Sequence, residues 1–221
     1  MIVPHAGYIY SGAVAAAAFA RLHSLRGRIA RAVIVGPAHY VPFRGIAAPS
    51  AAAFATPLGE LPVDGAAVAA LAAESLAVID DTPHGLEHAI EVELPFLQAL
   101  FGDLPIVPLL FGATSATTVA AAIARLWTDD TLLVISTDLS HFEDYESTRR
   151  HDARTAAAIE AYDEAAIGPS DACGHLAVRG ALIEAVRRHL TLERLVLRNS
   201  GDAAGDRRSV VGYGAWVFAP P

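Results

Sequence analysis

Lysine is absent from this sequence of 221 residues, so all 16 of its basic residues are arginines. Asp and Glu together number 24, which gives a formal net charge of −8. No more than two arginines stand side by side. A nucleic-acid groove needs a basic patch or stripe, and a phosphate-binding P-loop needs its lysine. Both classes of function are therefore excluded.

Cysteines and long apolar runs are also scarce. Cys173 is the single cysteine, which excludes an internal disulfide. No apolar run reaches the ~18 residues that would span a bilayer. The alanine-rich run 13–20 lacks the basic segment that precedes it in a signal peptide. We therefore expect a cytoplasmic protein that does not contact a membrane.

Apolar residues make up 53% of the chain and charged residues 18%, so the chain can bury a sizeable core. This length predicts a single domain over residues 1–221. Short apolar runs alternate with helical patterns, which is typical of a three-layer α/β/α fold with a mixed, mostly parallel central sheet. The expected strands are 1–3, 31–36, 76–79, 106–111, 131–136, 192–198 and 210–218, and the expected helices are 11–23, 64–75, 87–101, 115–127, 146–162 and 174–189.

Two segments contain residues that break regular structure. Residues 46–62 hold Gly59 and several prolines, which predicts short strands arranged as a hairpin or an active-site flap. Residues 87–101 show helical periodicity, but Pro95 stands in their middle and predicts a kink. Ser11 is the expected N-cap of the first helix, and residues 199–202 are expected to form a turn.

Three predicted strands are each followed by a histidine within a few residues. His5 follows the strand 1–3, His39 follows 31–36, and His141 follows 131–136. Open α/β sheets bind their ligands at the carboxyl ends of their strands. The pattern therefore predicts a metal or acid–base centre at this edge of the sheet.

Cys173 is a further candidate for that centre. A lone cysteine is often only a small buried apolar residue. Here Ser170 or Asp171 can cap the helix that follows, which would place Cys173 in its first turn, where the helix dipole favours a thiolate. Two neutral imidazoles and a thiolate suit a soft or borderline divalent metal, or a cuprous ion.

Other polar residues near these strand ends have two interpretations each. Asp138 stands three residues before His141 and is expected either to orient that histidine or to cap a turn. Glu87 begins the helix 87–101 together with His88, where a carboxylate also complements a helix N-terminus. His175 is a rival ligand to Cys173. The remaining histidines on predicted helices, His23, His151 and His189, are expected to face solvent.

Several motifs occur in a fixed order along almost the whole chain, and together they resemble the Memo family, called AmmeMemoRadiSam system protein B in prokaryotes. The motifs are Pro-His-Ala-Gly-Tyr-Ile-Tyr-Ser-Gly at 4–12, Gly-Pro-Ala-His-Tyr at 36–40, Thr-Pro-Leu-Gly at 56–59, Glu-His-Ala-Ile-Glu-Val-Glu-Leu-Pro-Phe at 87–96, Thr-Asp-Leu-Ser-His at 137–141, Cys-Gly at 173–174 and Asn-Ser-Gly-Asp at 199–202.

The resemblance implies a specific ligand set. The Memo family is similar to class III extradiol dioxygenases, which hold a ferrous ion with two histidines and a glutamate, whereas Memo proteins present two histidines and a cysteine. Carried over, the ligands are His5, His39 and Cys173. His141 and Asp138 match the remaining cleft residues, and His141 corresponds to the acid–base histidine of the dioxygenases. The family implies Fe(II) or Cu(I), with Zn(II) as the alternative, and the thiolate favours the softer metals.

The resemblance also implies what surrounds the domain. Members of the family usually begin well before the motif at Pro4, so we expect the N-terminal segment to be shortened here, with only three residues ahead of it. The system name implies a functional association with a radical-SAM protein and an AMMECR-type protein.

The preferred hypothesis is therefore a metal-dependent oxidoreductase that acts on an unknown small molecule or peptide, with no ring cleavage assumed. One rival is a non-catalytic module that binds a peptide or partner protein in the same cleft. Another is a zinc hydrolase whose metal-bound water is activated by Glu87 or His141. The physiological substrate does not follow from the sequence.

Overall fold

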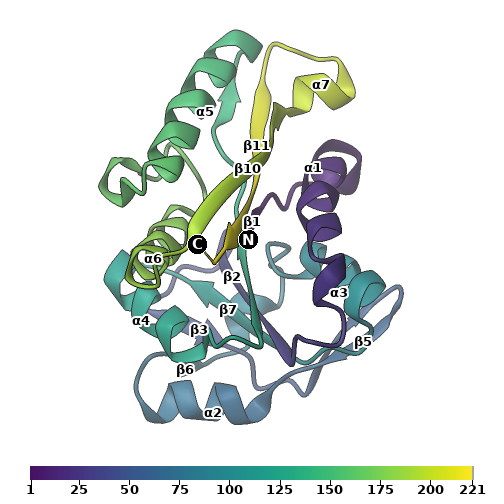
Figure 1. The fold of residues 1–221 in the computed structure, drawn as a ribbon, viewed down its shortest axis with the longest axis vertical. Coiled ribbons are helices and arrows are strands. Elements are labelled where there is room, and N and C mark those ends of the chain that lie inside the picture. The colour runs from purple at the N-terminus through teal and green to yellow at the C-terminus, as the bar shows by residue number, and fades with distance from the viewer. Residues whose placement is uncertain (221) are drawn as a thin grey trace.

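The computed structural model describes residues 1–220, apart from the side chain of Ala204 (Figure 1). Its strands are β1 Ile2–Val3, β2 Arg31–Pro37, β3 Ile46–Ala48, β4 Ala53–Thr56, β5 Gly59–Pro62, β6 Val78–Ile79, β7 Ile106–Phe111, β8 Thr131–Ser136, β9 His141–Glu143, β10 Thr191–Asn199 and β11 Val210–Ala219. Its helices are α1 Tyr8–Arg21, α2 Gly65–Ala73, α3 Leu94–Phe101, α4 Ala116–Leu126, α5 Tyr145–Glu160, α6 His175–Arg187 and α7 Ser200–Ala204.

One mixed sheet of nine strands runs through the molecule in the order β10-β11-β1-β8-β2-β7-β3-β6, with β9 paired to β11. The four central strands, β1, β8, β2 and β7, are mutually parallel. Antiparallel pairs join β11 to β1 on one side and β3 to β7 on the other. The predicted mixed, mostly parallel sheet is confirmed. Because the central strands share one direction, their carboxyl ends meet at a single edge.

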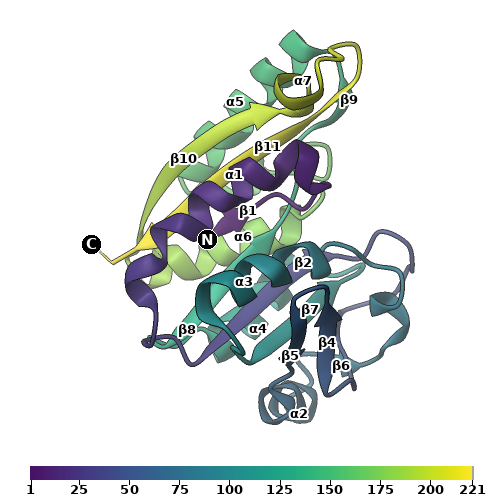
Figure 2. The ribbon, with the colours of Figure 1, turned by 90° about the vertical axis from the view of Figure 1, so that its right-hand side faces the viewer.

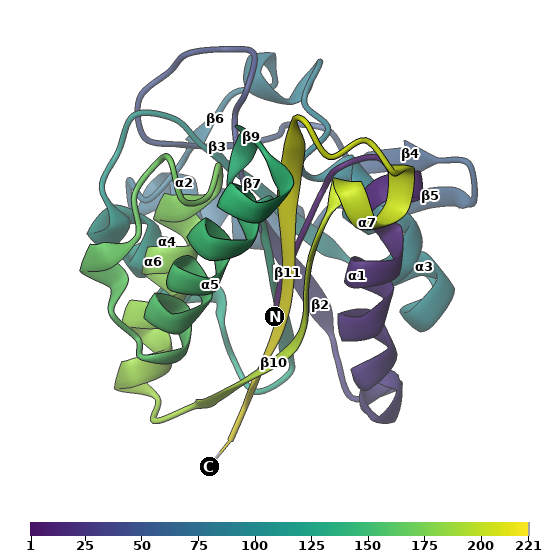
Figure 3. The ribbon, with the colours of Figure 1, turned by 90° about the horizontal axis from the view of Figure 1, so that it is seen from above.

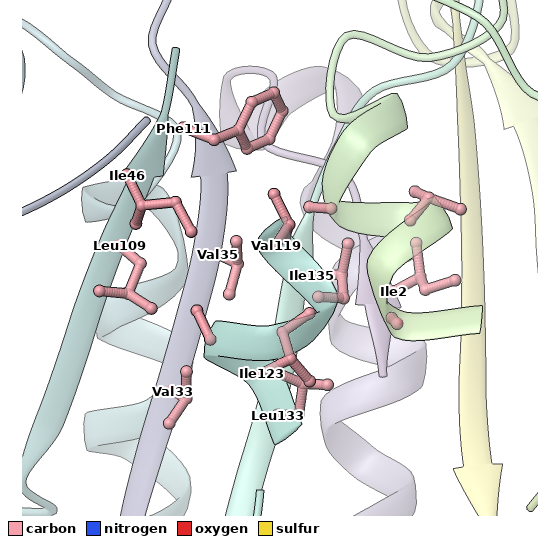
Figure 4. Close-up of a cluster of buried hydrophobic side chains, with 14 of the residues drawn as sticks. Ile2, Val33, Val35, Ile46, Leu109, Phe111, Val119, Ile123, Leu133 and Ile135 are labelled. Atoms are coloured by element: carbon pink, nitrogen blue, oxygen red, sulfur yellow. The ribbon is translucent and has the colours of Figure 1, made fainter. Parts of the chain in front are cut away.

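Helices cover both faces of this sheet, which confirms the three-layer architecture. Figure 3 shows α4, α5 and α6 on one side and α1 and α3 on the other. Side chains alternate along β2 accordingly. Val33 and Val35 join the core under α4 and α6 (Figure 4), whereas Ala32 and Ile34 join the core under α1 and α3. Strands buried on both faces read as continuous apolar runs, which is why the sequence revealed them.

Side chains cap the starts of α2, α4, α5 and α7. Asp64 accepts the backbone N–H of Ala67 ahead of α2, and Ser115 accepts that of Thr118 ahead of α4. The first helix differs from the prediction, because α1 begins at Tyr8 with Gly7 as its N-cap. Ser11 lies inside that helix, where its hydroxyl donates to the carbonyl of Ala6.

The segment 87–101 is not one kinked helix, so that prediction is wrong. Residues 87 and 88 have no regular structure, residues 89 and 90 form a turn, a short 3₁₀ segment covers Glu91–Glu93, and α3 begins only at Leu94. Pro95 lies in the first turn of α3, where its missing N–H disturbs no helical bond. The proline therefore starts this helix, and the residues before it are free to turn toward the strand ends.

The segment 46–62 resolves into two parts. β3 pairs with β7 in the main sheet, whereas β4 and β5 form a separate two-stranded hairpin (Figure 2). Of the two predicted arrangements, the hairpin is present. Residues 199–202 are not a simple turn, because Asn199 and Asp202 form a capping box on the short helix α7. Within residues 1–220 no helix combines the length and apolarity needed to cross a membrane.

Candidate metal centre

Three neighbouring strands carry the predicted histidines to one edge of the sheet. β1 pairs with β8 and β8 pairs with β2, all in parallel, so the residues that follow these strands come together. His5 is 2% exposed, and its ring centroid lies 5.3 Å from that of His39. His141 follows β8, and His39 is close enough to lower its pKa. The strand ends that carry His5 and His39 therefore converge, and His141 follows the strand that lies between them in the sheet.

A third histidine joins His5 and His39. His88 lies 5.4 Å from His5 and 5.1 Å from His39 between ring centroids. One ring nitrogen from each of the three lies within 4.8 Å of the others. Among residues 1–220 this is the group of three whose side chains could share a metal ion. Three imidazoles are donors suited to iron, copper or zinc.

Hydrogen bonds fix which nitrogen two of these rings present. The Nδ1 atom of His39 lies 2.9 Å from the Glu87 carboxylate, and Nδ1 of His5 lies 2.7 Å from the hydroxyl of Ser136. Ser136 gives its own hydroxyl proton to the carbonyl of Ala89, so it must accept from His5. Both rings therefore keep their proton on Nδ1 and present an unprotonated Nε2, the form that ligates a metal.

Glu87 is buried and acts as an anchor for this arrangement. It accepts the ring N–H of His39 and the backbone N–H groups of His39, His88 and Ala89. Burial alone would raise the pKa of Glu87, but the bonds from His39 and Ala89 outweigh it and lower that pKa to about 2. The carboxylate is thus ionised, and both of its oxygens accept N–H groups from the two histidine segments.

Burial controls the charge of His5 as well. It lowers the pKa of His5 to about 3, helped by the neighbouring His39 and His88. His5 is consequently neutral at neutral pH, as a metal ligand must be.

Cys173 reaches the same ring from another side. Its sulfur lies 3.4 Å from Nε2 of His5 and accepts the backbone N–H of Asp138 at 3.3 Å. The structure thus brings the sequence-predicted ligands together in pairs, His5 with His39 and His5 with Cys173. The group of three nitrogens contains His88 in place of the sulfur.

The local setting of Cys173 differs from the prediction. α6 begins at His175 with Gly174 as its N-cap, so Cys173 precedes the helix and lies outside its first turn. Asp171 does not cap α6 but accepts the N–H of Gly168. Burial, followed by the charge of Asp138, raises the pKa of Cys173 to about 12. The helix dipole does not make a thiolate here, and a bound cation would have to displace the proton.

Asp138 does not orient His141. Its Oδ1 atom accepts the backbone N–H of His5 at 2.9 Å and that of Ala6 at 3.3 Å. Burial raises its pKa to about 7 against the effect of these two bonds. Asp138 therefore fixes the backbone that carries His5. His141 is half-buried at the start of β9, and burial, more than its neighbour His39, lowers its pKa.

Glu93 is a site-proximal residue that the sequence did not single out. Its side chain is completely buried, and within residues 1–220 neither carboxyl oxygen has a hydrogen-bond partner. Burial, reinforced by the charge of Asp138, raises the pKa of Glu93 well above its usual value. Its surroundings therefore favour the protonated, neutral form of the side chain. Pro95 was the feature of the sequence that could have revealed Glu93 and His88. It marks the start of α3 and so leaves the preceding residues outside a helix.

The surroundings of two other histidines, His151 and His175, can be compared with the predictions. His151 was expected to face solvent, but its side chain is only 12% exposed and bridges Glu143 and Asp171 at 2.8 Å each. His175, the rival to Cys173, packs its ring edge-on to Phe111 and lies outside the group of three.

Fold and site together define the class: an α/β/α protein with converging histidines at the carboxyl edge of a mixed sheet. The family model described as Memo-like protein matches residues 1–217, and the chain belongs to this family. A MEMO1 family protein of Thermotoga maritima is 37% identical over 96% of this chain and 80% of its own length. One from Methanopyrus kandleri is 33% identical over 99% of this chain and 82% of its own.

A solved structure shares the fold. It is that of an uncharacterized protein from Escherichia coli K12, with a TM-score of 0.61, covering 96% of this chain and 97% of that one. At 15% sequence identity this likeness concerns the architecture alone.

Proposed function

We propose that the protein binds Fe(II) or Cu(I), with Zn(II) as the alternative, through His5, His39 and a third ligand, and that it performs a redox reaction there. The observation that carries the proposal is the convergence of three imidazole nitrogens within 4.8 Å. Membership of the Memo-like family, whose resemblance implies such a site, adds support.

His5 and His39, the ligands common to both possible sets, are preorganised by hydrogen bonds. Glu87 holds His39, and Ser136 holds His5, each through Nδ1. A carboxylate or hydroxyl behind a histidine fixes the ring and raises its basicity as a ligand. Both rings are therefore oriented before any ion arrives, which reduces the ordering that binding requires.

The third ligand is Cys173, as the family resemblance implies, with His88 as its competitor. His5 is common to both arrangements, since its Nε2 lies 3.4 Å from the sulfur and its ring also belongs to the group with His88. A thiolate selects the softer metals, whereas three imidazoles also accept zinc. Ligand identity and metal identity are therefore linked.

A bound iron or copper ion would supply one-electron chemistry to the site. His141 supplies proton transfer. Burial lowers its pKa and so favours its neutral form. It follows β8, which lies between β1 and β2, the strands that precede His5 and His39, and there we assign it the proton exchange with whatever binds beside His39. Asp138 holds the His5 backbone and takes no direct part.

The test begins with anaerobic purification, elemental analysis and X-ray absorption. We expect a metal ion per chain with metal–nitrogen distances near ~2.0–2.1 Å. A metal–sulfur distance near ~2.3 Å identifies Cys173 as a ligand, and its absence excludes Cys173 and leaves His88 as the candidate. Cys173→Ser and His88→Gln, titrated with the same ion, should give the same answer independently. Absence of any bound transition metal from the anaerobic protein contradicts the proposal.

A pair of variants tests the division of roles. His5→Gln should lose metal and oxygen uptake together, whereas His141→Gln should keep its metal and lose only the oxygen uptake. His23→Gln is the matched control, because His23 is exposed and lies beyond the end of α1 that is farther from His5. Loss of metal from His141→Gln would place that residue among the ligands. Zinc content without oxygen uptake in the parent protein would favour the hydrolase.

A further inference from the structure

Large apolar side chains are exposed mainly around the candidate metal centre. Ten such residues are exposed on the described surface, and six of them lie within five residues of a site histidine. We call these six the apolar rim: Tyr8, Ile9, Tyr10, Tyr40, Leu86 and Phe142. The other four are Leu58, Val78, Ile79 and Val186.

Contacts place the rim beside the histidines in space as well as in sequence. The Tyr40 ring lies 6.0 Å from His88 and 6.3 Å from His39 between centroids. The Phe142 ring lies 5.6 Å from His141. The rim therefore approaches the centre from two different strand ends.

The start of α1 completes the rim on a third side. Tyr8 donates its hydroxyl to the carbonyl of Val92 at 2.9 Å, which ties this helix to the segment that follows His88. A cavity of about 390 Å³ opens beside Tyr8, lined also by Gly12, Pro95 and Phe96. Tyr8 thus also lines a hollow whose walls are apolar.

Phe142 is the extra residue of a β-bulge. In the pairing of β9 with β11, Val210 faces Glu143 and Val211 faces His141, with a shift of register between them. The φ of Phe142, +61°, is a left-handed conformation that occurs at such bulges. Bulges beside functional sites re-aim a side chain, and this one leaves Phe142 75% exposed next to His141.

We propose that the site takes a small molecule with two parts, a polar head that ligates the metal and an apolar body that covers the rim. The inference deepens the proposed function and rests on it. His5 is 2% exposed, so the head must reach below the surface. The rim residues carry no charge and are mostly half-exposed or more, so they match an alkyl or aryl body rather than a sugar or a highly charged metabolite.

The experiment uses alkyl hydroxamates as probes, because their hydroxamate group chelates a metal and their alkyl chain can be varied in length. Acetohydroxamate, hexanohydroxamate and octanohydroxamate are titrated into anaerobic, metal-loaded protein. A methylene that becomes fully buried improves affinity by about fourfold, so affinity should rise steeply with chain length. The triple variant Tyr40→Ser, Leu86→Ser, Phe142→Ser should lose this rise and keep the affinity for acetohydroxamate.

Leu58→Ser combined with Val186→Ser is the matched control, since both residues are exposed and apolar but lie outside the rim. It should behave like the parent protein. Affinity independent of chain length, or a rise that survives in the rim variant, overturns the proposal. So does a failure of octanohydroxamate to bind. Metal content, measured on the same samples, separately tests the proposed function.

Discussion

Glu87 shows how a single buried carboxylate organises the centre. It receives the ring N–H of His39 and three backbone N–H groups, so it fixes both a predicted ligand and the turn that carries His88. The sequence left two roles open for this residue, complementing a helix N-terminus or acting as the base of a hydrolase. The structure gives it a more specific role, because its oxygens hold two histidine segments against each other.

Replacing Glu87 with glutamine should therefore weaken metal binding. The amide cannot satisfy all the donors that meet it, and it withdraws the negative charge behind His39. We expect a loss of about 10–100-fold in metal affinity and of about 1–3 kcal/mol in the free energy of unfolding. Metal titration and denaturant melts measure the two effects. Glu60→Gln, an exposed glutamate, should change neither, and wild-type affinity in Glu87→Gln would contradict this role.

At the scale of elements, the segment carrying Cys173 is positioned by its close approach to β8. A Cβ atom on Gly174 would lie 2.6 Å from the Cβ of Thr137 and 2.8 Å from the carbonyl oxygen of Ser136. The backbone N–H of Gly174 also donates to the Thr137 hydroxyl at 2.8 Å. A residue with a side chain cannot occupy this place without moving the segment.

Gly174→Ala should accordingly push the Cys173 segment away from the end of β8. We expect a destabilisation of about 1–3 kcal/mol from overpacking, together with loss of any metal–sulfur bond detected by X-ray absorption. Gly65→Ala is the control, because nothing lies within 4 Å of its added Cβ. Equal melting temperatures for both variants would show that the segment adjusts freely.

A second link between elements runs through His151 on α5. Its ring bonds to Glu143 on β9 and to Asp171 in the segment before Cys173. Burial would lower the pKa of His151, but the bonds to Asp171 and Glu143 outweigh it and raise that pKa. The buried carboxyl of Asp152 lies close enough for His151 to influence its pKa too. Protonated His151 thus joins the strand of His141 to the segment of Cys173.

The sign of the resulting pH dependence follows from the raised pKa. The stabilisation by His151 is fully present below the ordinary histidine pKa of about 6.5 and is lost as the pH rises through the raised value. Unfolding free energies measured from pH 6 to pH 9 should fall more steeply for the parent protein than for His151→Phe. His23→Phe, at an exposed position, should follow the parent. If the unfolding free energy had the same slope against pH in the parent protein and in His151→Phe, the proposed stabilisation by His151 would be contradicted.

For the whole molecule, metal binding and folding should be coupled. The candidate ligands come from residues 5, 39, 88 and 173, which converge only when β1, β2 and β8 are assembled. An ion that binds only the folded state at 100 times its dissociation constant stabilises that state by about 2.7 kcal/mol. We expect the anaerobic melting temperature to rise by roughly 5–10 °C. His5→Gln should melt at one temperature with or without the ion.

Much of the architecture could be predicted because it depends on short-range patterns. The apolar runs 31–36, 106–111 and 131–136 indicated central strands, and the structure has β2, β7 and β8 there. Parallel strands buried on both faces need continuous apolar residues, so their sequence carries the signal directly. Histidines that follow such strands must then meet at one edge, which is why His5, His39 and His141 could be found.

Contacts between distant segments could not be predicted from such short-range patterns. The periodicity of residues 87–101 favoured a helix over the turn that delivers His88, because the pattern does not show which backbone state tertiary packing selects. Asp138 stands near His141 in sequence but bonds to His5, 133 residues away.

The sequence by itself determined the alternation of strands and helices, the family, and the edge of the sheet where the histidines gather, since each of these follows from local apolar patterning or ordered motifs. Only the tertiary structure decided that Glu87 anchors His39, that Cys173 lies ahead of α6 rather than in its first turn, and that His151 is bridged instead of exposed. Those features depend on side-chain contacts across strands and loops, whose geometry is set when the layers pack and is not encoded in any single segment.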